Sequence, residues 1–212
     1  MEKELQKRIL TSIMIIPISL FFIIKGSVFF ILFLIILFFI ASLEWMKIVK
    51  KIKFKLLGIF FLFFSFYSVY FIRNIDLSIF FLVFLICIAT DIGGYVFGKI
   101  FKGPKITKIS PNKTYSGMIG GFLLSIVLSY FFIEKYSSFW IEQNFAKNLT
   151  LVLIIFFISS VSQIGDLIIS YFKRLSKIKN TGNILPGHGG LLDRIDGMIF
   201  AFPFVFLIFK IL

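Results

Sequence analysis

A polar stretch near the end of one apolar run carries residue types that act on phosphate groups. It contains Asp166, Ser170 and Lys173, with Arg174 directly after. Spacings of three and four residues place the carboxylate, the hydroxyl and the ammonium group on one stripe of a helix. A carboxylate inside a transmembrane helix costs about 2.5–3.5 kcal/mol on insertion scales, so it is rarely incidental. We therefore expect a site that holds a metal ion among phosphates, the alternative being a helix-end carboxylate neutralised by a nearby lysine.

A second stretch combines a glycine-rich loop with two carboxylates between positions 185 and 196. Its candidate members are Gly187, His188, Gly189, Gly190, Asp193, Arg194 and Asp196. The backbone N–H groups of such glycines can approach an anion closely. The two carboxylates are three residues apart and share a face if the last helix begins there. They could instead serve only as helix caps, but a cap requires neither the arginine nor the glycine loop.

Two further polar segments give weaker signals. The stretch 99–121 contains Ser110, Lys113 and Thr114 among several glycines, a mixture that suits phosphate contact but also occurs in plain basic loops. Asp91 lies in an apolar run, where a functional role and neutralisation by Lys99 are equally compatible with the sequence. The chain contains no Walker loop, dinucleotide-binding glycine motif, zinc-protease motif or serine-hydrolase elbow. Hydride transfer, zinc hydrolysis and serine hydrolysis therefore find no support.

The elements that position these residues are predicted to be membrane-spanning helices. Of the 212 residues, 59% are hydrophobic and 32 are phenylalanine, a composition that cannot supply the polar shell of a soluble domain. Seven apolar runs approach or reach the roughly 20 residues that a spanning helix needs. They are Ile9–Ile24, Ser27–Leu43, Leu56–Phe71, Leu77–Val96, Met118–Ile133, Leu149–Ile169 and Met198–Leu212. We expect an all-α, polytopic membrane helix bundle of about seven transmembrane helices, with six to nine compatible.

The basic residues indicate how the bundle is oriented. The net charge is +13, but most of the 23 Lys and Arg residues fall at the N-terminus and in alternate loops. The positive-inside rule then places the N-terminus and these loops in the cytoplasm, so the charge indicates topology and not nucleic-acid binding. We expect one integral membrane domain over residues 1–212. Residues 1–84 would form an apolar scaffold, and residues 85–212 a catalytic half with cytoplasmic loops 99–117 and 173–196.

At this point the motifs resemble those of a known family, the phosphatidate cytidylyltransferases (CDP-diacylglycerol synthases). The resemblance rests on Ser170-x-x-Lys173-Arg174 followed by Pro186-Gly187-His188-Gly189-Gly190-x-x-Asp193-Arg194-x-Asp196. Three shorter segments also resemble family elements: Gly165-Asp166-Leu167, Thr90-Asp91-x-Gly93 and Ser110-Pro111-x-Lys113-Thr114. The chain departs from the family pattern at Asn112, Ser116 and Asn180, where the family often has a lysine, an acidic residue and an aspartate.

The resemblance implies synthesis of CDP-diacylglycerol and pyrophosphate from CTP and phosphatidic acid, in phospholipid biosynthesis. It implies a multi-pass protein of the inner (plasma) membrane whose active site faces the cytoplasm. Asp166 and Asp193 would hold Mg²⁺, with Asp196 as a further ligand and K⁺ as a second cation. Catalytic cations would be Lys173, Arg174 and Arg194, and the substrate-binding residues would be Ser110, Lys113, Thr114, Ser170, Gly187, His188, Gly189 and Gly190.

Two other functions are compatible with parts of the sequence. A CTP-dependent polyprenol or phytol kinase would release CDP and not pyrophosphate. A transporter could line its pathway with intramembrane carboxylates such as Asp91 and Asp166. The acidic residues near the cytoplasmic ends of the spans and the one-sided glycine and cation loops favour the enzyme. Acyl-chain preference, CTP versus dCTP and oligomeric state are not determined by the sequence, and a homodimer is compatible with it.

Overall fold

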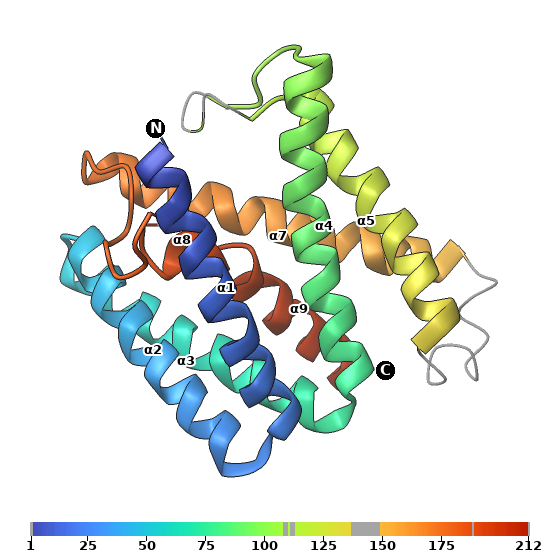
Figure 1. Ribbon diagram of the computed structural model, residues 1–212, viewed down its shortest axis with the longest axis horizontal. Coiled ribbons are helices and arrows are strands. Elements are labelled where there is room, and N and C mark those ends of the chain that lie inside the picture. The colour runs from blue at the N-terminus through green and yellow to red at the C-terminus, as the bar shows by residue number, and fades with distance from the viewer. Residues whose placement is uncertain (1, 108–109, 111–112, 137–148, 188, 212) are drawn as a thin grey trace.

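The chain folds into helices joined by short loops in a computed structural model, which describes residues 2–107, 110, 113–136, 149–187 and 189–211. Within these ranges the helices are α1 (Glu2–Lys25), α2 (Ser27–Ile48), α3 (Ile52–Ile75), α4 (Leu77–Phe101), α5 (Tyr115–Tyr136), α7 (Leu149–Leu175), α8 (Leu192–Ile195) and α9 (Met198–Ile211) (Figure 1). The only β-type pairings in this part of the chain are two isolated bridges. The predicted all-α architecture is confirmed.

Each predicted apolar run lies in a helix, because backbone polar groups in lipid must be satisfied within the segment itself. Five helices are long and apolar enough to cross a membrane, namely α2, α3, α4, α5 and α7. The other two predicted runs correspond to shorter apolar segments, Leu10–Lys25 and Met198–Lys210. The structure thus supports a polytopic membrane protein, while seven crossings and the orientation of the N-terminus stay predictions.

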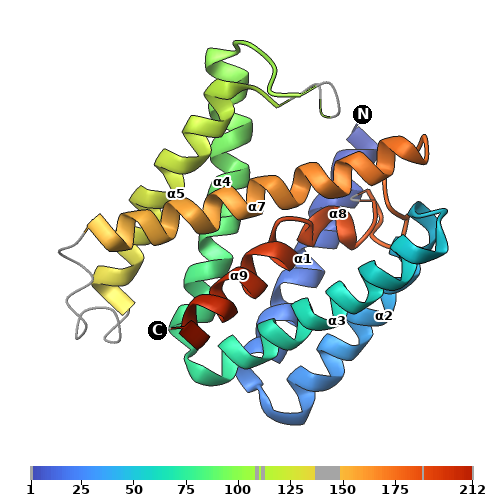
Figure 2. The same cartoon turned by 180° about the vertical axis from the view of Figure 1, so that it is seen from behind.

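Helices α4 and α5 form a closely packed antiparallel pair, which projects from the rest of the molecule in both views (Figures 1 and 2). A Cβ added at Gly93 would lie 2.5 Å from the carbonyl oxygen of Gly120. One added at Gly117 would lie 2.5 Å from the carbonyl oxygen of Gly94. Small residues let membrane helices approach in this way. Gly117 and Gly120 therefore serve the packing of α5 against α4, while phosphate contact by this stretch stays a prediction.

The buried core lies where α9 meets α3, α4 and α7. Leu62, Ile86, Ile155 and Phe202 are almost completely buried there. Many large apolar side chains on the outer faces remain exposed, including Phe60, as expected for helices that face lipid. The core thus fixes the relative positions of the helix ends that carry the polar residues.

The polar residues gather at one end of the molecule. The end of α2, the end of α7, the loop that follows α7 and the short helix α8 lie together there (Figures 1 and 2). The hydroxyl of Ser176, just after α7, donates to the carbonyl oxygen of Ile48 at the end of α2. This contact joins the N-terminal scaffold to the half of the chain that carries the motifs described above.

Candidate active site

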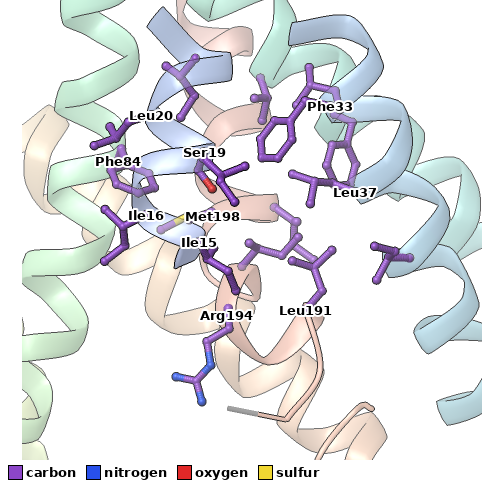
Figure 3. A pocket seen from close by; sticks show the side chains of 18 of the residues that line it. Ile15, Ile16, Ser19, Leu20, Phe33, Leu37, Phe84, Leu191, Arg194 and Met198 are labelled. Atoms are coloured by element: carbon purple, nitrogen blue, oxygen red, sulfur yellow. The ribbon is translucent and has the colours of Figure 1, made fainter. Parts of the chain in front are cut away.

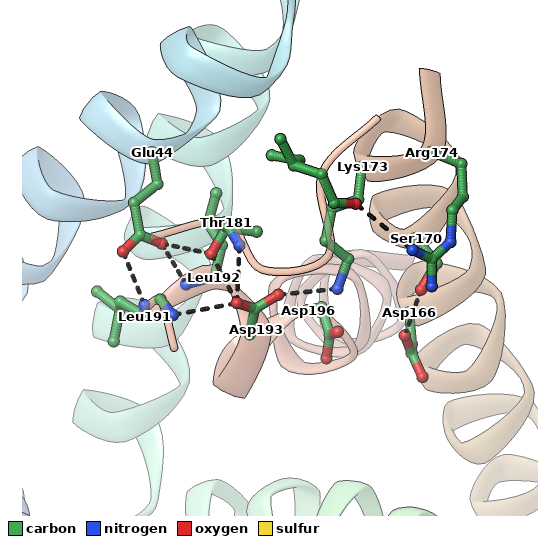
Figure 4. A network of polar contacts seen from close by, with 12 residues as sticks. Glu44, Asp166, Ser170, Lys173, Arg174, Thr181, Leu191, Leu192, Asp193 and Asp196 are labelled. Atoms are coloured by element: carbon green, nitrogen blue, oxygen red, sulfur yellow. Dashed lines mark hydrogen bonds and ion pairs between the residues drawn. The ribbon is translucent and has the colours of Figure 1, made fainter. Parts of the chain in front are cut away.

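A buried glutamate of the scaffold organises the loop between α7 and α8, residues 176–191. Glu44, in the last turns of α2, is 1% exposed. Its carboxylate accepts hydrogen bonds from the backbone N–H groups of Leu191 (2.9 Å) and Leu192 (2.8 Å). It also accepts one from the hydroxyl of Thr181 at 2.8 Å (Figure 4). Because α8 begins at Leu192, Glu44 binds the orphan N–H groups at the start of this helix from a distant part of the chain.

Asp193 closes the same loop from the other side. Its Oδ2 atom accepts hydrogen bonds from the backbone N–H groups of Thr181 (2.8 Å) and Gly190 (3.0 Å). Its Oδ1 atom accepts one from the Lys173 ammonium group at 2.8 Å, and the two side chains are 12% and 9% exposed. A metal ion at Oδ1 would take the place of this ammonium group. In this structure Asp193 ties α7, the loop and α8 together (Figure 4).

Asp166 and Ser170 lie on one stripe of α7, as the spacing predicts. The Ser170 hydroxyl donates to Asp166 Oδ1 at 3.2 Å (Figure 4). The other oxygen of Asp166 forms an ion pair with Lys113 Nζ at 2.5 Å, with the two side chains about a quarter exposed. Lys113 reaches this position from the turn before α5, whose backbone is held by hydrogen bonds to Pro104 and Ile106. The structure therefore brings two sequence-predicted segments into direct contact.

A second and a third carboxyl group lie close to Asp166. Asp196, just after α8, is 9% exposed, and its carboxyl group interacts electrostatically with that of Asp166. Burial raises the pKa of Asp196 well above its usual range, and the negative charges of Asp166 and Asp91 raise it further. Asp91, on α4, interacts electrostatically with Asp166, Lys113 and Arg194. Asp91, whose role the sequence leaves open, therefore lies near the other carboxylates.

The glycine loop uses its backbone donors internally. The N–H groups of Leu185 and Gly189 donate to each other's carbonyl oxygens at 2.9 and 3.0 Å, which closes a tight turn. Gly187 and Gly189 have φ of 77° and 89°, a region that favours glycine. The N–H of Gly190 donates to Asp193. The N–H groups of Gly189 and Gly190 therefore bind within the protein, contrary to the expected anion cradle, and His188 lies outside the described residues.

The remaining predicted residues lie around this centre with different contacts. Thr114 accepts a hydrogen bond from the N–H of Gly117 at 3.2 Å and so caps the start of α5. Ser110 lies in the loop before it and contributes its carbonyl oxygen to the N–H of Lys113. Arg174 is exposed near the end of α7 and donates to the carbonyl oxygen of Ile178 at 3.5 Å. Arg194 is exposed on α8.

The donor set fits a hard divalent cation better than any other metal. Carboxylate oxygens of Asp166, Asp196 and Asp91 supply negative charge that the flanking lysines only partly offset, and Mg²⁺ prefers such oxygen ligands. Within the described residues, however, no three acidic, histidine or cysteine side chains form an assembled metal centre. The ammonium groups of Lys113 and Lys173 supply the positive charge beside Asp166 and Asp193. Cations of the type that binds phosphate therefore lie beside carboxylates at this end of the molecule.

Glu44 and Thr181 are site residues that the sequence analysis missed. Glu44 is an acidic residue directly after the apolar run Ser27–Leu43, a signal related to that of Asp91 and Asp166, which lie inside apolar runs. Applied to every run, this criterion would have found it. Nothing in the sequence indicates its partners, which lie 137 or more residues away. Thr181 carries no local signal of its own.

The fold and the site together define a helical membrane protein with a polar centre suited to phosphate chemistry. A sequence model described as the cytidylyltransferase family matches residues 51–212, and the chain belongs to this family.

Individual relatives agree with this assignment. The chain is 34% identical to the phosphatidate cytidylyltransferase of Rickettsia bellii over 213 residues, covering 98% of this chain and 91% of the relative. It is 32% identical to that of Rickettsia felis over 218 residues, covering 98% and 93%. It is 39% identical to that of Bacillus subtilis over 141 residues, covering 65% of this chain and 50% of that relative. The similarity to the Rickettsia proteins thus extends over nearly the whole chain.

Proposed function

We propose that this protein is a CTP:phosphatidate cytidylyltransferase, which makes CDP-diacylglycerol and pyrophosphate from CTP and phosphatidic acid. Its membership of the cytidylyltransferase family and the shared name of its relatives support this reaction. The observation that carries the proposal is the paired arrangement of Lys113 on Asp166 and Lys173 on Asp193 at one end of a membrane helix bundle. Such a centre has both the cations that bind phosphates and the carboxylates that hold a metal.

The chemistry needs charge stabilisation more than proton transfer. A phosphate monoester has its second pKa near about 6, so the lipid phosphate oxygen is already a competent nucleophile at neutral pH. It attacks the α-phosphorus of CTP, and the bond from that phosphorus to the bridging oxygen of pyrophosphate breaks. Lys113, Lys173 and Arg174 would offset the charge of the two anions and of the leaving group. No general base is required, which is why His188 is assigned to substrate contact.

Carboxylates at the ends of α7 and α8 would hold Mg²⁺. Asp166, Asp196 and Asp193 are the proposed ligands, and Asp91 lies near enough to contribute charge. When bound, the metal would supply Lewis-acid stabilisation of the phosphoryl oxygens. Lys113 and Lys173, which pair with Asp166 and Asp193 in this structure, would contact the phosphates of the substrates. A K⁺ ion as second cation is part of the proposal only through the family resemblance.

The site is proposed to face the cytoplasm of the cell, in the inner membrane. This orientation follows from the excess of Lys and Arg in alternate loops and puts the N-terminus on the same side. It requires seven crossings, with α1 and α9 both passing through the bilayer. CTP would then reach the site from the cytoplasm, and phosphatidic acid from the surrounding lipid.

The choice of acceptor lipid tests the proposal. Purified protein in detergent micelles receives CTP and Mg²⁺ with phosphatidate, with diacylglycerol or with a polyprenol, and pyrophosphate and CDP are both measured. We expect pyrophosphate to form only with phosphatidate, in equal amount to the nucleotide-bearing lipid. Formation of CDP with a lipid alcohol would show the kinase reaction and would overturn the assignment. Solute flux in liposomes without either product would support a transporter.

A further inference from the structure

The turn between α2 and α3 carries a concentration of positive charge that the proposed reaction does not use. Helix α2 ends at Ile48 and α3 begins at Ile52. Lysines lie on both sides of this short connection and within it: Lys47, Lys50, Lys51, Lys53 and Lys55. Four of them are exposed and Lys55 is half-buried. We refer to residues 47–57 as the basic turn.

No carboxylate in the described part of the chain forms a salt bridge with these lysines. The first turn of α3 contains no acidic residue, and the positive end of its helix dipole adds to the lysine charge. Glu44, the acidic residue nearest in the sequence, is buried and accepts hydrogen bonds from the α7–α8 loop and the start of α8. Because like charges repel at such short separations, the basic turn is complementary to anions from outside the chain.

The basic turn would lie among lipid headgroups, because α2 and α3 are both long and apolar enough to cross a membrane. Only residues 49–51 join the two helices, so the turn stays close to the bilayer surface. Apolar side chains are interleaved with the lysines: Ile52, Leu56 and Leu57 are 66%, 63% and 66% exposed. Exposed apolar groups beside cations suit the boundary between acyl chains and headgroups. Clusters of about four to eight basic residues beside a spanning helix are typical of sites for anionic lipids.

The basic turn packs directly against the end of α7. The indole N–H of Trp45 donates to the carbonyl oxygen of Phe54 at 3.2 Å, across the turn. The Phe172 ring of α7 lies against both side chains, with its centroid 4.8 Å from that of Trp45 and 6.1 Å from that of Phe54. A Cβ added at Gly58 would overlap the Trp45 indole, so the space beside this ring is full. The aromatic contacts therefore couple the basic turn to the end of α7.

The last turns of α2 also hold the α7–α8 loop. The Ser176 hydroxyl donates to the carbonyl oxygen of Ile48, immediately before the connection to α3. Glu44, one helical turn earlier, accepts hydrogen bonds from the N–H groups of Leu191 and Leu192 at the start of α8. The backbone that carries the lysines thus also positions the loop of the candidate active site.

The basic turn is separate from the apolar cavity of about 560 Å³ between α1 and its neighbouring helices (Figure 3). On α2 the lining of that cavity extends no further toward the turn than Ile40, and on α3 it begins at Ser65. Arg194, one of the sequence-predicted site residues, also lines the cavity. The cavity therefore borders the candidate active site, whereas the lysines of the basic turn lie on the outer surface.

We propose that the basic turn binds anionic phospholipids of the surrounding bilayer and that this contact stabilises the α7–α8 loop. Headgroup phosphates placed between the lysines would offset their mutual repulsion and hold the turn against α7. The lipid is one with a phosphodiester headgroup, such as phosphatidylglycerol. A phosphodiester lacks the second ionisable oxygen of a phosphate monoester, which is the nucleophile of the proposed reaction. The bound lipid would therefore act as a regulator and not as a substrate.

Lipid retention by the full-length protein tests the binding. The protein is captured from detergent micelles that contain equal amounts of phosphatidylglycerol and phosphatidylcholine, and the lipids that remain after washing are measured by mass spectrometry. We expect phosphatidylglycerol to be retained in preference to phosphatidylcholine. The preference should weaken in a wash with about 1 M salt, because the Debye length then falls to about 3 Å.

Matched variants locate the bound lipid. A triple glutamine variant of the basic turn combines Lys50→Gln, Lys51→Gln and Lys53→Gln. It should lower the preference at least about tenfold, since each lysine near an anionic surface strengthens binding about fivefold. Substitution of the same three lysines by arginine should keep the preference. The control variant removes the same charge from isolated lysines at other helix ends and should also keep it: Lys25→Gln, Lys135→Gln and Lys210→Gln.

Hydrogen exchange tests the coupling to the site loop without requiring turnover. The N–H groups of Leu191 and Leu192 donate to Glu44, so their exchange reports the opening of this region. Phosphatidylglycerol in place of phosphatidylcholine should slow this exchange by about fivefold or more in the wild type, the effect of one lysine–lipid contact. The triple glutamine variant should exchange at the same rate in both lipids, whereas the control variant should respond like the wild type.

Equal retention of the two lipids, or an unchanged preference in the triple glutamine variant, would overturn the proposed lipid site. Preferential retention without slower exchange would refute its coupling to the α7–α8 loop. Slower exchange with phosphatidate but not with phosphatidylglycerol would assign the effect to the substrate and would also overturn the proposal. Neither measurement depends on CDP-lipid synthesis, so a protein that binds phosphatidylglycerol but makes no CDP-lipid would refute the proposed reaction and leave the lipid site standing.

Discussion

Replacing one carboxylate oxygen of Glu44 by an amide nitrogen, in Glu44→Gln, should loosen the α7–α8 loop without disturbing the membrane helices. The side chain is 1% exposed and accepts three hydrogen bonds, two of them from the backbone of Leu191 and Leu192. In Glu44→Gln the amide oxygen can retain the donors that face Oε2, which are Leu192 N–H and the hydroxyl of Thr181. The amide nitrogen then faces the N–H of Leu191, so two donors oppose each other.

The magnitude follows from the one buried donor that loses its acceptor. A buried donor left without a partner costs about 1–3 kcal/mol. If the loop opens independently of the helices, this cost raises its open population by about 5- to 150-fold. Glu44→Ala leaves all three donors without the carboxylate, at a cost of about 3–9 kcal/mol, which is comparable to the whole stability of a typical domain. Glu44→Gln is therefore the informative change, and Glu44→Ala is expected to fail to fold.

Limited trypsin digestion in detergent measures loop opening directly, because Lys177 and Lys179 lie exposed in the α7–α8 loop. In Glu44→Gln, cleavage at these lysines should accelerate by about 5- to 150-fold if cleavage follows the open population. Cleavage at Lys135, exposed near the end of α5, provides the internal reference. Turnover should fall in the same variant, because in the opened loop the N–H groups of Thr181 and Gly190 no longer hold the carboxylate of Asp193 in place.

A matched control is Glu134→Gln, since Glu134 is an exposed glutamate of α5. This variant should digest and turn over like the wild type, as surface substitutions usually change stability by less than about 0.5 kcal/mol. Wild-type cleavage rates and turnover in Glu44→Gln would refute the role given to Glu44. Equal acceleration at Lys135 would show general unfolding and would refute the idea of an independent loop.

Three further predictions follow from other contacts. Lys113→Gln should change the free energy of unfolding by no more than about 1 kcal/mol, because the ion pair with Asp166 is partly exposed. It should lower turnover, measured by pyrophosphate release, by about 100-fold. Normal turnover would remove Lys113 from the site. Gly93→Ala should lower the thermal unfolding midpoint through overpacking that costs about 1–3 kcal/mol. Gly94→Ala should be tolerated, since its added Cβ would lie 3.8 Å from the nearest atom. An equal fall of the unfolding midpoint in both glycine variants would contradict this account of the α4–α5 contact. A cysteine at Asn74 should react with an impermeant thiol reagent from outside the cell while one at Asn180 should not, and the reverse pattern would overturn the orientation.

The helices could be predicted from the sequence because lipid imposes one requirement on every span, a long apolar segment with internal hydrogen bonds. Run Leu149–Ile169 lies within helix α7, and the stripe from Asp166 to Ser170 follows from helical geometry alone. A continued helix would add Lys177 to this stripe, but α7 ends at Leu175 and Lys177 has φ of 56°. Local charge patterns do not determine where a helix ends.

The parts that escaped prediction depend on partners distant in the sequence. Gly117 and Gly120 lie in a stretch whose composition resembles that of a phosphate-binding loop. Their role in helix packing becomes evident only from the close contact with α4. The N–H groups of the loop glycines, including Gly190, were expected to face an anion from outside the protein. The N–H of Gly190 faces Asp193 and that of the next residue, Leu191, faces Glu44, because buried carboxylates of the chain already supply the negative charge. A sequence shows donors and acceptors, whereas their pairing requires the fold.

The position of the phosphorus atoms after turnover tests the central claim most directly. CTP labelled with one phosphorus radioisotope at the α-position and another at the γ-position is incubated with phosphatidate, Mg²⁺ and purified protein, with Asp166→Asn as the inactive reference. We predict that the lipid acquires the α label alone, that the γ label leaves in pyrophosphate in equal amount, and that both signals disappear in Asp166→Asn. Lipid carrying the γ label, or an undiminished α label with Asp166→Asn, would contradict the account.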